Sequence, residues 1–343
     1  MASSGALEPL LESLEKAKMR PVTFDGVVPD PTTTSLNAGV ELVAGCDSVV
    51  GFGGGSSLDS AKAIAVLAAH GGPLARFKVP VETPMGLPVV AIPTTAGTGS
   101  EVTRVAIVTD TDTDEKMLLM GAGLLPEIAL VDYELTMKKP YRLTADSGLD
   151  ALCHALEAYV SRKATPFTDT LALGASRTVV HHLRSACRDP TDEPAREALM
   201  LASTQAGIAF SNASVTLIHG MSRPLGAHFH VPHGMSNAIL LPRITEYSVP
   251  GAVERYAAAS RAIGFADGSD ADNAACNKLI DGLNVLCEDL TVPTLSKLGI
   301  ARSDFVASAP RMAEQALASG SPNNNPVVPS AEAVEKLYDA VYA

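Results

Sequence analysis

The fold is decided by residues 49–62, which read VVGFGGGSSLDSAK. An apolar run passes through a glycine cluster into a segment with one apolar helical face, which predicts a buried strand, a tight turn and a helix. Glycines let a phosphate approach the backbone closely, and the free N–H groups of a helix start favour negative charge. A strand-to-helix turn without a ligand has the same pattern and stays an alternative. The spacing is neither that of a Walker A loop nor Gly-x-Gly-x-x-Gly.

On both sides of this stretch, short apolar runs alternate with helical patterns through the first third of the chain. We expect strands at 22–28, 48–53, 89–93, 105–109 and 128–131, and helices at 6–18, 35–44 and 57–69. This alternation is typical of a mostly parallel α/β sheet. A second small-residue loop, 93–103 (PTTAGTGSEVT), also follows an apolar strand. Two such loops at successive strand ends predict one crevice for an extended, phosphate-bearing ligand.

The domain organisation follows from where these strand signals stop. The chain has 343 residues, of which 46% are hydrophobic and 19% charged, so it can bury a sizeable core in two domains. Beyond about Lys139 only Ala/Leu-rich helical patterns remain. We therefore expect an α/β domain over residues 1–139 and an all-helical domain over residues 140–343.

Charge and cysteine content narrow the partners and the compartment. The 26 Lys and Arg residues against 38 Asp and Glu residues give a net charge of -12, which opposes binding to nucleic acid or to anionic membranes. Five cysteines without a Cys-x-x-Cys pair predict free thiols. The chain start has no secretory pattern, and no stretch approaches the ~18 apolar residues that cross a bilayer. We expect a cytoplasmic protein that is not bound to a membrane.

Two later segments indicate a metal site. Residues 143–159 (LTADSGLDALCHALEAY) put Asp150 and His154 four apart, on one helix face. Residues 219–234 (HGMSRPLGAHFHVPHG) hold four of the eight histidines. One carboxylate with two or three neutral imidazoles suits Fe(II), Zn(II) or another first-row divalent ion with an open position for substrate. The alternatives are a capping Asp beside a core His, and a merely polar or pH-sensitive histidine loop.

Taken together, these motifs resemble the iron-containing alcohol dehydrogenase family over essentially the whole chain. Within that family they are similar to lactaldehyde reductases (propanediol oxidoreductases) and broad-range alcohol dehydrogenases. The resemblance implies a dehydroquinate synthase-like fold, with an N-terminal dinucleotide-binding domain, an all-helical C-terminal domain and a divalent metal in the cleft between them. It implies hydride transfer between NAD or NADP and a small primary or secondary alcohol or aldehyde, with diols and hydroxy acids among the candidates. A homodimer is expected.

The resemblance also assigns site residues by position in the motifs. The implied metal ligands are Asp150, His154, His219 and His233, and the implied metal is Fe2+, with Zn2+ as the alternative. The implied cofactor contacts are Gly53, Gly54, Gly55, Ser56, Asp59, Thr94, Thr95, Thr103 and Lys116. The metal would act on the substrate oxygen as a Lewis acid while the cofactor gives or takes the hydride.

One departure from the family pattern concerns the proton. Many members read His-Gly-Met-x-His-Pro, and this chain has Arg223 at the second histidine. An arginine stays protonated and cannot serve as a general base. The proton would instead pass through His228, His230, water or the ribose hydroxyl. Arg223 would bind a carboxylate or phosphonate on the substrate, or else pair with a nearby acid.

A second departure concerns the chain start. Members of the family open with a strand, a hairpin and another strand, whereas this chain begins at the following helix. Loss of a central strand would leave backbone unpaired and weaken cofactor binding. The alternative function is therefore a cofactor-impaired homologue or a non-catalytic metal-binding subunit. A metal-dependent hydrolase is disfavoured because the two nucleotide loops would lack a role, and a metal-free reductase because all four ligand positions are filled.

Overall fold

The computed structural model describes residues 5–113 and 115–342, which divide into two compact units. Unit 1 comprises Met1–Thr95 and Ser100–Asp132, and unit 2 comprises Ala96–Gly99 and Tyr133–Ala343. The division after Asp132 differs from the expected boundary at 139/140. It also assigns Ala96–Gly99, from the second small-residue loop, to the helical unit. This segment belongs to the helical unit because its backbone packs directly against that of Gly207: a Cβ added to Gly99 would lie 2.5 Å from the Gly207 Cα.

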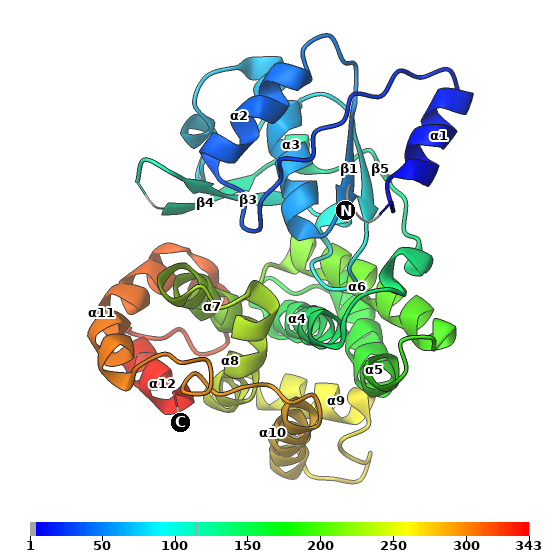
Figure 1. Ribbon diagram of the computed structural model, residues 1–343. Coiled ribbons are helices and arrows are strands. Elements are labelled where there is room, and N and C mark those ends of the chain that lie inside the picture. The colour runs from blue at the N-terminus through cyan, green and yellow to red at the C-terminus, as the bar shows by residue number, and fades with distance from the viewer. Residues whose placement is uncertain (1–4, 114, 343) are drawn as a thin grey trace. The chain divides into compact units, whose positions relative to one another are not determined.

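Unit 1 is built on a parallel sheet with the strand order β1-β2-β5 (Figure 1). These strands are β1 (Val49–Gly53), β2 (Val89–Pro93) and β5 (Ile128–Ala129). In the register of β1 and β2, Val49 pairs with Val89 and Gly53 with Pro93, so the two strands end at the same edge. The expected parallel α/β sheet is confirmed, and the two loops start side by side.

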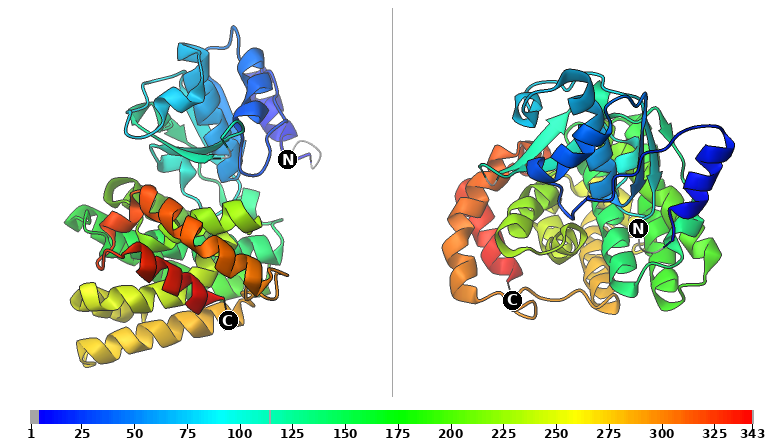
Figure 2. Two further views of the ribbon diagram at one scale, coloured as in Figure 1. Left: turned by 90° about the vertical axis from the view of Figure 1, so that its left-hand side faces the viewer. Right: turned by 45° about the horizontal axis from the view of Figure 1, so that its top comes forward.

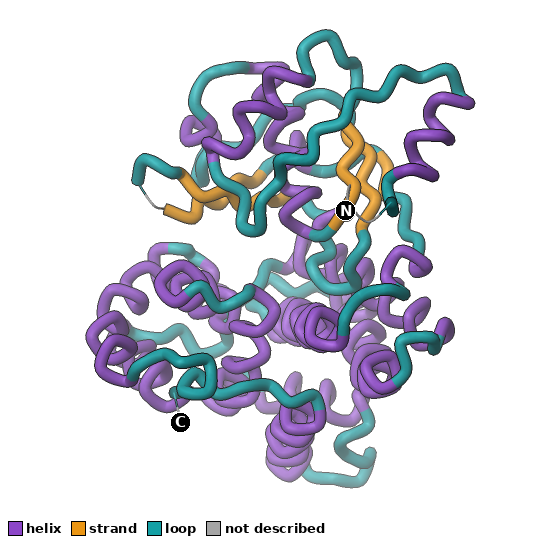
Figure 3. The backbone as a smooth tube through the Cα atoms, in the orientation of Figure 1, coloured by secondary structure: helices purple, strands orange, loops and turns teal. Residues whose placement is uncertain are grey.

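The remaining strands of unit 1 form a separate antiparallel pair, visible in Figure 3. It consists of β3 (Val105–Asp110) and β4 (Glu115–Met120). The expected strand at 105–109 therefore exists but does not join the parallel sheet. The expected strand at 22–28 is wrong: these residues lie outside every strand, and Val22 is 59% exposed. An apolar run forms a strand only where a neighbouring backbone is free to pair with it.

Three helices complete unit 1, and α2 and α3 share its core. They are α1 (Glu8–Lys16), α2 (Thr33–Leu42) and α3 (Gly55–His70). A capping box between Thr32 and Ser35 starts α2. Helix α3 buries Leu58, Ala61 and Ile64, as the apolar face of 57–69 predicts. The first turn of α3 follows the end of β1 after one residue, Gly54.

Unit 2 is a helical bundle, and its described residues contain no strand (Figure 2). Its helices are α4 (Tyr141–Val160), α5 (Pro166–Arg188), α6 (Glu193–Ala213), α7 (Leu217–Phe229), α8 (His233–Ser248), α9 (Val253–Ile263), α10 (Asp272–Asp289), α11 (Arg302–Ala318) and α12 (Ala331–Val341). Helix α4 packs against α5, α6 and α8 and is buried on nearly all sides from Thr144 onward. Polar residues on α4 therefore lie inside the bundle.

Two expectations from the sequence concern the cysteines and membrane-spanning segments. All five cysteines are free; Cys46 is half-buried and the other four are buried. In the described ranges, every helix is too short or too polar to pass through a bilayer.

Candidate metal centre and nucleotide loops

Three helices of unit 2 bring the four expected metal ligands together. Helix α4 carries Asp150 and His154 one turn apart, His219 lies in the first turn of α7, and His233 is the first residue of α8. Each residue offers one ligand atom, and the four atoms lie within 4.8 Å of one another. The His219 and His233 Nε2 atoms are 3.5 Å and 3.7 Å from the Asp150 Oδ1 atom. Such a group can hold one cation.

The four side chains differ in exposure. Asp150, His154 and His219 are 2%, 4% and 3% exposed, whereas the His233 side chain is 36% exposed. Burial alone would raise the pKa of Asp150, but the neighbouring imidazoles hold it far below its usual value. Burial lowers the pKa of His154 to about 3, so its ring is neutral. The centre thus has a buried floor and one side open to solvent.

Hydrogen bonds fix the orientation of two of the imidazole rings. The His154 Nδ1–H donates to the Gly97 carbonyl over 3.2 Å, which leaves the Nε2 lone pair available. The His154 ring stacks on Phe210 and on His219, with centroids 4.2 Å and 4.3 Å away. His219 donates through Nδ1 to a Glu157 carboxylate oxygen, so its Nε2 is the ring nitrogen at which a metal can replace a proton. Both rings are held as metal ligands require.

Glu157 orients His219, and the sequence analysis did not single it out. Its other oxygen accepts from the Thr216 hydroxyl and the Ile218 backbone N–H, each at 2.7 Å. Burial would lower the pKa of His219, but Glu157 and Asp150 raise it to about 9. Glu157 follows Asp150 by seven residues on α4, a spacing that puts both on one helix face. That spacing was a usable signal.

Asn237, which the sequence analysis also missed, supplies an N–H group at the centre. Its side-chain Nδ2 lies 2.6 Å from Asp150 Oδ1, 3.0 Å from His219 Nε2 and 3.2 Å from His233 Nε2. Its Oδ1 is buried and has no hydrogen-bond partner among the described residues. The Asn237 amide, with two hydrogens, therefore faces three potential ligand atoms. One carboxylate and three imidazoles fit a first-row divalent ion such as Fe2+ or Zn2+.

The two small-residue loops start side by side in unit 1, at the ends of β1 and β2. The Thr94 N–H donates to the Gly53 carbonyl over 2.9 Å, and a Cβ on Gly54 would lie 3.4 Å from the Thr95 side chain. Gly53 has a φ of 149°, and a Cβ there would lie 2.3 Å from the Ser57 hydroxyl oxygen. Only glycine fits at Gly53 without a shift of Ser57.

The start of α3 is free to receive an anion. Gly54 is its N-cap, no side chain caps the helix, and its first turn holds no acidic residue. Gly55 and Ser56 are the first two helical residues, so their N–H groups have no partner one turn earlier within the helix. A 16-residue helix beginning in this way favours a phosphate at its N-terminus.

Two other expected cofactor contacts take part in a polar network within unit 1. The Asp30 backbone N–H donates to the Ser56 hydroxyl over 3.2 Å. The Lys116 ammonium group lies 3.0 Å from an Asp30 carboxylate oxygen. Asp30 therefore links Ser56 and Lys116 and places both beside the first loop.

A fully buried lysine, which the sequence analysis did not single out, joins α3 to the second loop. The Lys62 Nζ donates to the Ser100 hydroxyl at 2.9 Å, to the Thr103 carbonyl at 3.0 Å and to the Val105 carbonyl at 2.9 Å. The Thr103 hydroxyl lies 3.2 Å from the same Nζ. Burial lowers the pKa of Lys62 to about 8. Thr103, expected to contact the cofactor, contacts this lysine.

Asp59, also expected near the cofactor, has a similar internal role. One of its carboxylate oxygens accepts from the Ser100 hydroxyl at 2.7 Å, and the other accepts from the Ile107 N–H at 3.0 Å. Burial raises the pKa of Asp59, while Lys62 opposes that shift. Asp59 and Thr103 therefore hold the second loop against α3.

The three residues considered for proton transfer or substrate binding lie on or just after α7. The Arg223 Nη1 donates to the Ser321 hydroxyl over 3.1 Å, and its buried Nε has no partner among the described residues. Among the described residues Arg223 makes no ion pair within 4.0 Å, although Glu157 is close enough to act on its charge. His228 Nε2 lies 2.9 Å from the Gln315 side-chain oxygen, and His230 is an exposed C-cap with a φ of 55°. Neither histidine belongs to the four-residue centre.

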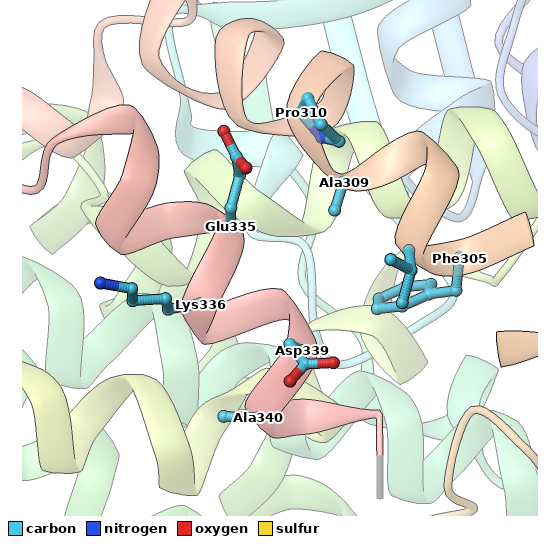
Figure 4. A pocket seen from close by; sticks show the side chains of 8 residues that line it. Phe305, Ala309, Pro310, Glu335, Lys336, Asp339 and Ala340 are labelled. Carbon is cyan, nitrogen blue, oxygen red and sulfur yellow. The ribbon is translucent and has the colours of Figure 1, made fainter. Parts of the chain in front are cut away.

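A surface pocket of about 420 Å³ lies between α11 and α12 (Figure 4). Its lining residues are Phe305, Val306, Ala309, Pro310, Glu335, Lys336, Asp339 and Ala340. None of them was expected in the site, and none belongs to the four-residue centre.

Comparison with known proteins places this geometry in a family. Residues 1–133 match the model described as iron-containing alcohol dehydrogenase, and residues 144–342 match the C-terminal model of the Fe-containing alcohol dehydrogenase family. The chain is 39% identical to a 1-propanol dehydrogenase of Salmonella typhimurium, over 97% of this chain and 90% of that protein. It is also 39% identical to a 1,3-propanediol dehydrogenase of Citrobacter freundii, over 94% of this chain and 83% of that one.

A solved structure gives the same result. The crystal structure of a 1,3-propanediol oxidoreductase has a TM-score of 0.94 and 35% identity, covering 98% of this chain and 88% of that one. None of these comparisons supports the alternative of a non-catalytic subunit. The chain therefore belongs to the iron-containing alcohol dehydrogenase family and is an NAD(P)-dependent alcohol oxidoreductase.

Proposed function

We propose that Asp150, His154, His219 and His233 bind the divalent metal of this oxidoreductase, and that the substrate is a small primary or secondary alcohol or its aldehyde or ketone. The observation that carries this proposal is the convergence of the four ligand atoms within 4.8 Å. Fe2+ is the proposed ion and Zn2+ the alternative, because both accept one carboxylate with imidazoles. When bound, such an ion supplies a Lewis acid that stabilises negative charge developing on the substrate oxygen.

The chain itself contributes the orientation of the ligands. Glu157 holds the proton of His219 on Nδ1, and the Gly97 carbonyl does the same for His154. Both rings then present Nε2 to one point without rearrangement. The buried positions of Asp150, His154 and His219 exclude water from the floor of the centre, which strengthens electrostatic interactions there.

The nucleotide loops provide the proposed cofactor site. We propose that the pyrophosphate lies at the start of α3, on Gly53, Gly54, Gly55 and Ser56, with Thr94, Thr95 and Lys116 as further contacts. The free N–H groups of the first helical turn support this assignment. Asp59 and Thr103 act indirectly, by holding the second loop in place. Either NAD or NADP fits this description.

Several groups are proposed to carry the proton that the alcohol loses. Arg223 remains protonated, so it does not accept a proton from the alcohol. His228, His230, water and the ribose hydroxyl stay as the proposed carriers. We further expect the enzyme to act in the cytoplasm as a homodimer.

The proposal is tested by removing and restoring the metal. The chelated, metal-free protein should oxidise neither 1-propanol nor 1,2-propanediol with NAD+ or NADP+, and added Fe2+ or Zn2+ should restore the activity. A fluorescence titration with NADH tests the cofactor site separately. Full activity of protein shown by elemental analysis to lack metal would contradict the proposal.

A further inference from the structure

Arg223 combines a position next to the metal centre with an incomplete set of partners. It follows His219 by four residues on α7, and side chains at that spacing lie on one helix face with their Cβ atoms about 6 Å apart. The side chain is partly buried, and its Nε is fully buried without a partner among the described residues. Its one hydrogen bond to the described part of the chain is to the neutral hydroxyl of Ser321.

A buried guanidinium without an anion is unfavourable. Burial lowers the pKa of Arg223, which expresses the cost of keeping the charge away from water. Among the described acids, Glu157 opposes this shift. Its carboxylate is already occupied by bonds from Thr216, Ile218 and His219. An anionic group from outside the chain would supply the partner that Arg223 lacks.

The charge of the metal centre leads to the same conclusion. With a divalent ion bound, the carboxylates of Asp150 and Glu157 balance its charge, and the neutral imidazoles add none. The Arg223 guanidinium then leaves one positive charge in excess. A site of this kind attracts a substrate that carries a negative charge of its own.

We propose that Arg223 binds an anionic group of the substrate, a carboxylate or another small oxyanion, a few atoms from the carbon that is oxidised or reduced. The substrate class is therefore a short hydroxy acid and its aldehyde acid. This inference rests on the proposed metal-dependent oxidoreductase function and specifies its substrate. A phosphate of the cofactor is a second possible source of the same anion chemistry.

The test compares two aldehydes of equal length that differ by one carboxylate. Succinic semialdehyde and butanal are reduced by the metal-loaded enzyme with NADH or NADPH. The variants are Arg223→Gln, which removes the charge, Arg223→Lys, which keeps it, and the control Arg243→Gln. Arg243 lies on the neighbouring helix α8, is 49% exposed and pairs with Glu246 at 2.6 Å.

The expected result is a loss confined to the charged substrate. The wild type should prefer succinic semialdehyde, and Arg223→Gln should lower kcat/KM for it by about 30-fold, the range for a lost bond to a charged group. Butanal reduction should change little, Arg223→Lys should keep part of the preference, and Arg243→Gln should behave as the wild type. Calorimetry should show succinate binding to the metal-loaded wild type and much weaker binding to Arg223→Gln.

Several results would overturn the inference. They are equal losses for both aldehydes, a wild type without preference that succinate neither binds nor inhibits, and a raised KM for NADH with an unchanged aldehyde preference. The last result would assign Arg223 to the cofactor. The wild-type measurements decide the matter even if Arg223→Gln fails to fold. Reduction of butanal alone leaves the proposed function standing, whereas reduction of neither aldehyde contradicts both.

Discussion

The α/β unit and the helical unit each bury a charged network, and the two networks differ in how donors and acceptors match. In the α/β unit, the Lys62 ammonium donates to Ser100, Thr103 and Val105, so its hydrogens have partners. In the helical unit, lone pairs of Asp150 and the imidazoles converge, and the Asn237 amide is the group that donates to them. The first network is complete in itself, whereas the second fits a cation.

This difference shows what a shifted pKa does and does not indicate. The pKa of Lys62 is lowered to about 8 and that of His219 is raised to about 9, so both residues are perturbed. Perturbation is common at functional sites, but structural ion pairs produce it too. The convergence of four potential ligand atoms within 4.8 Å of one another distinguishes the metal centre from the structural network.

The largest expected effect comes from Asp150→Asn, which removes the charged ligand while keeping the size of the side chain. We expect the metal content to fall far below one ion per chain and kcat/KM for alcohol oxidation to fall by about 1000-fold. Elemental analysis and steady-state kinetics measure the two effects. Asp289→Asn is the control, since Asp289 is 49% exposed and pairs with Arg184 outside the centre. A variant that keeps its metal and its activity would remove the distinction between the two networks.

Lys62→Met tests the structural network. The substitution leaves Asp59 and two backbone carbonyls without their buried cation, so the free energy of unfolding should fall by about 3 kcal/mol. Denaturant titration measures the change, and Lys336→Met, at an exposed ion pair on α12, is the control. Metal content should stay at the wild-type level. Loss of metal with unchanged stability would mean that the roles of the two networks are misassigned.

Glu157→Gln tests whether the hydrogen bond between Glu157 and His219 Nδ1 supports metal binding. Without the carboxylate, the His219 ring is oriented less firmly and is less basic, so metal affinity should fall by roughly 10–100-fold. A Zn2+ competition titration measures the affinity. Glu332→Gln, at an exposed pair with Lys336, provides the matched control. An unchanged affinity would show that Glu157 has no part in positioning His219.

The smallest effect per step of the variable is a pH dependence of stability that arises from Lys62, because it is spread over more than two pH units. Its pKa is about 8 in the folded protein and 10.5 in the unfolded chain, so between these pH values the unfolded chain binds more protons. Stability contributed by Lys62 therefore rises with pH in this window, by at most about 1.4 kcal/mol per pH unit. The difference in unfolding free energy between wild type and Lys62→Met should grow from pH 8 to pH 10.5. Parallel stability curves would contradict the burial of a charged Lys62.

The sequence predicted part of the metal centre, and the structure explains the limit. The spacing of Asp150 and His154 was visible in the chain, but histidine density could not separate His219 and His233 from His228 and His230. The separation depends on the chain path: α7 ends at Phe229, and the left-handed His230 turns the chain before α8 begins. The resemblance to a family, and not the spacing, selected His219 and His233 as ligands.

The sequence could not identify the residues that contact the metal ligands from other helices. Glu157 and Asn237 stand at helical spacings from a ligand, yet their importance comes from contacts with α7 and α4. In unit 1, the strand at 115–120 was missed because Glu115 and Lys116 interrupt the apolar pattern, although Met117 and Leu119 are buried. The strand expected at 22–28 does not form because no strand in the described part of the chain pairs with this run.

Anomalous diffraction from crystals of the metal-loaded protein tests the central claim most directly. Data collected on both sides of the iron or zinc absorption edge should give a single strong peak within about 2.0–2.3 Å of ligand atoms from Asp150, His154, His219 and His233. A fully active protein whose crystals show no peak there, or show the metal at another position, would contradict the assignment.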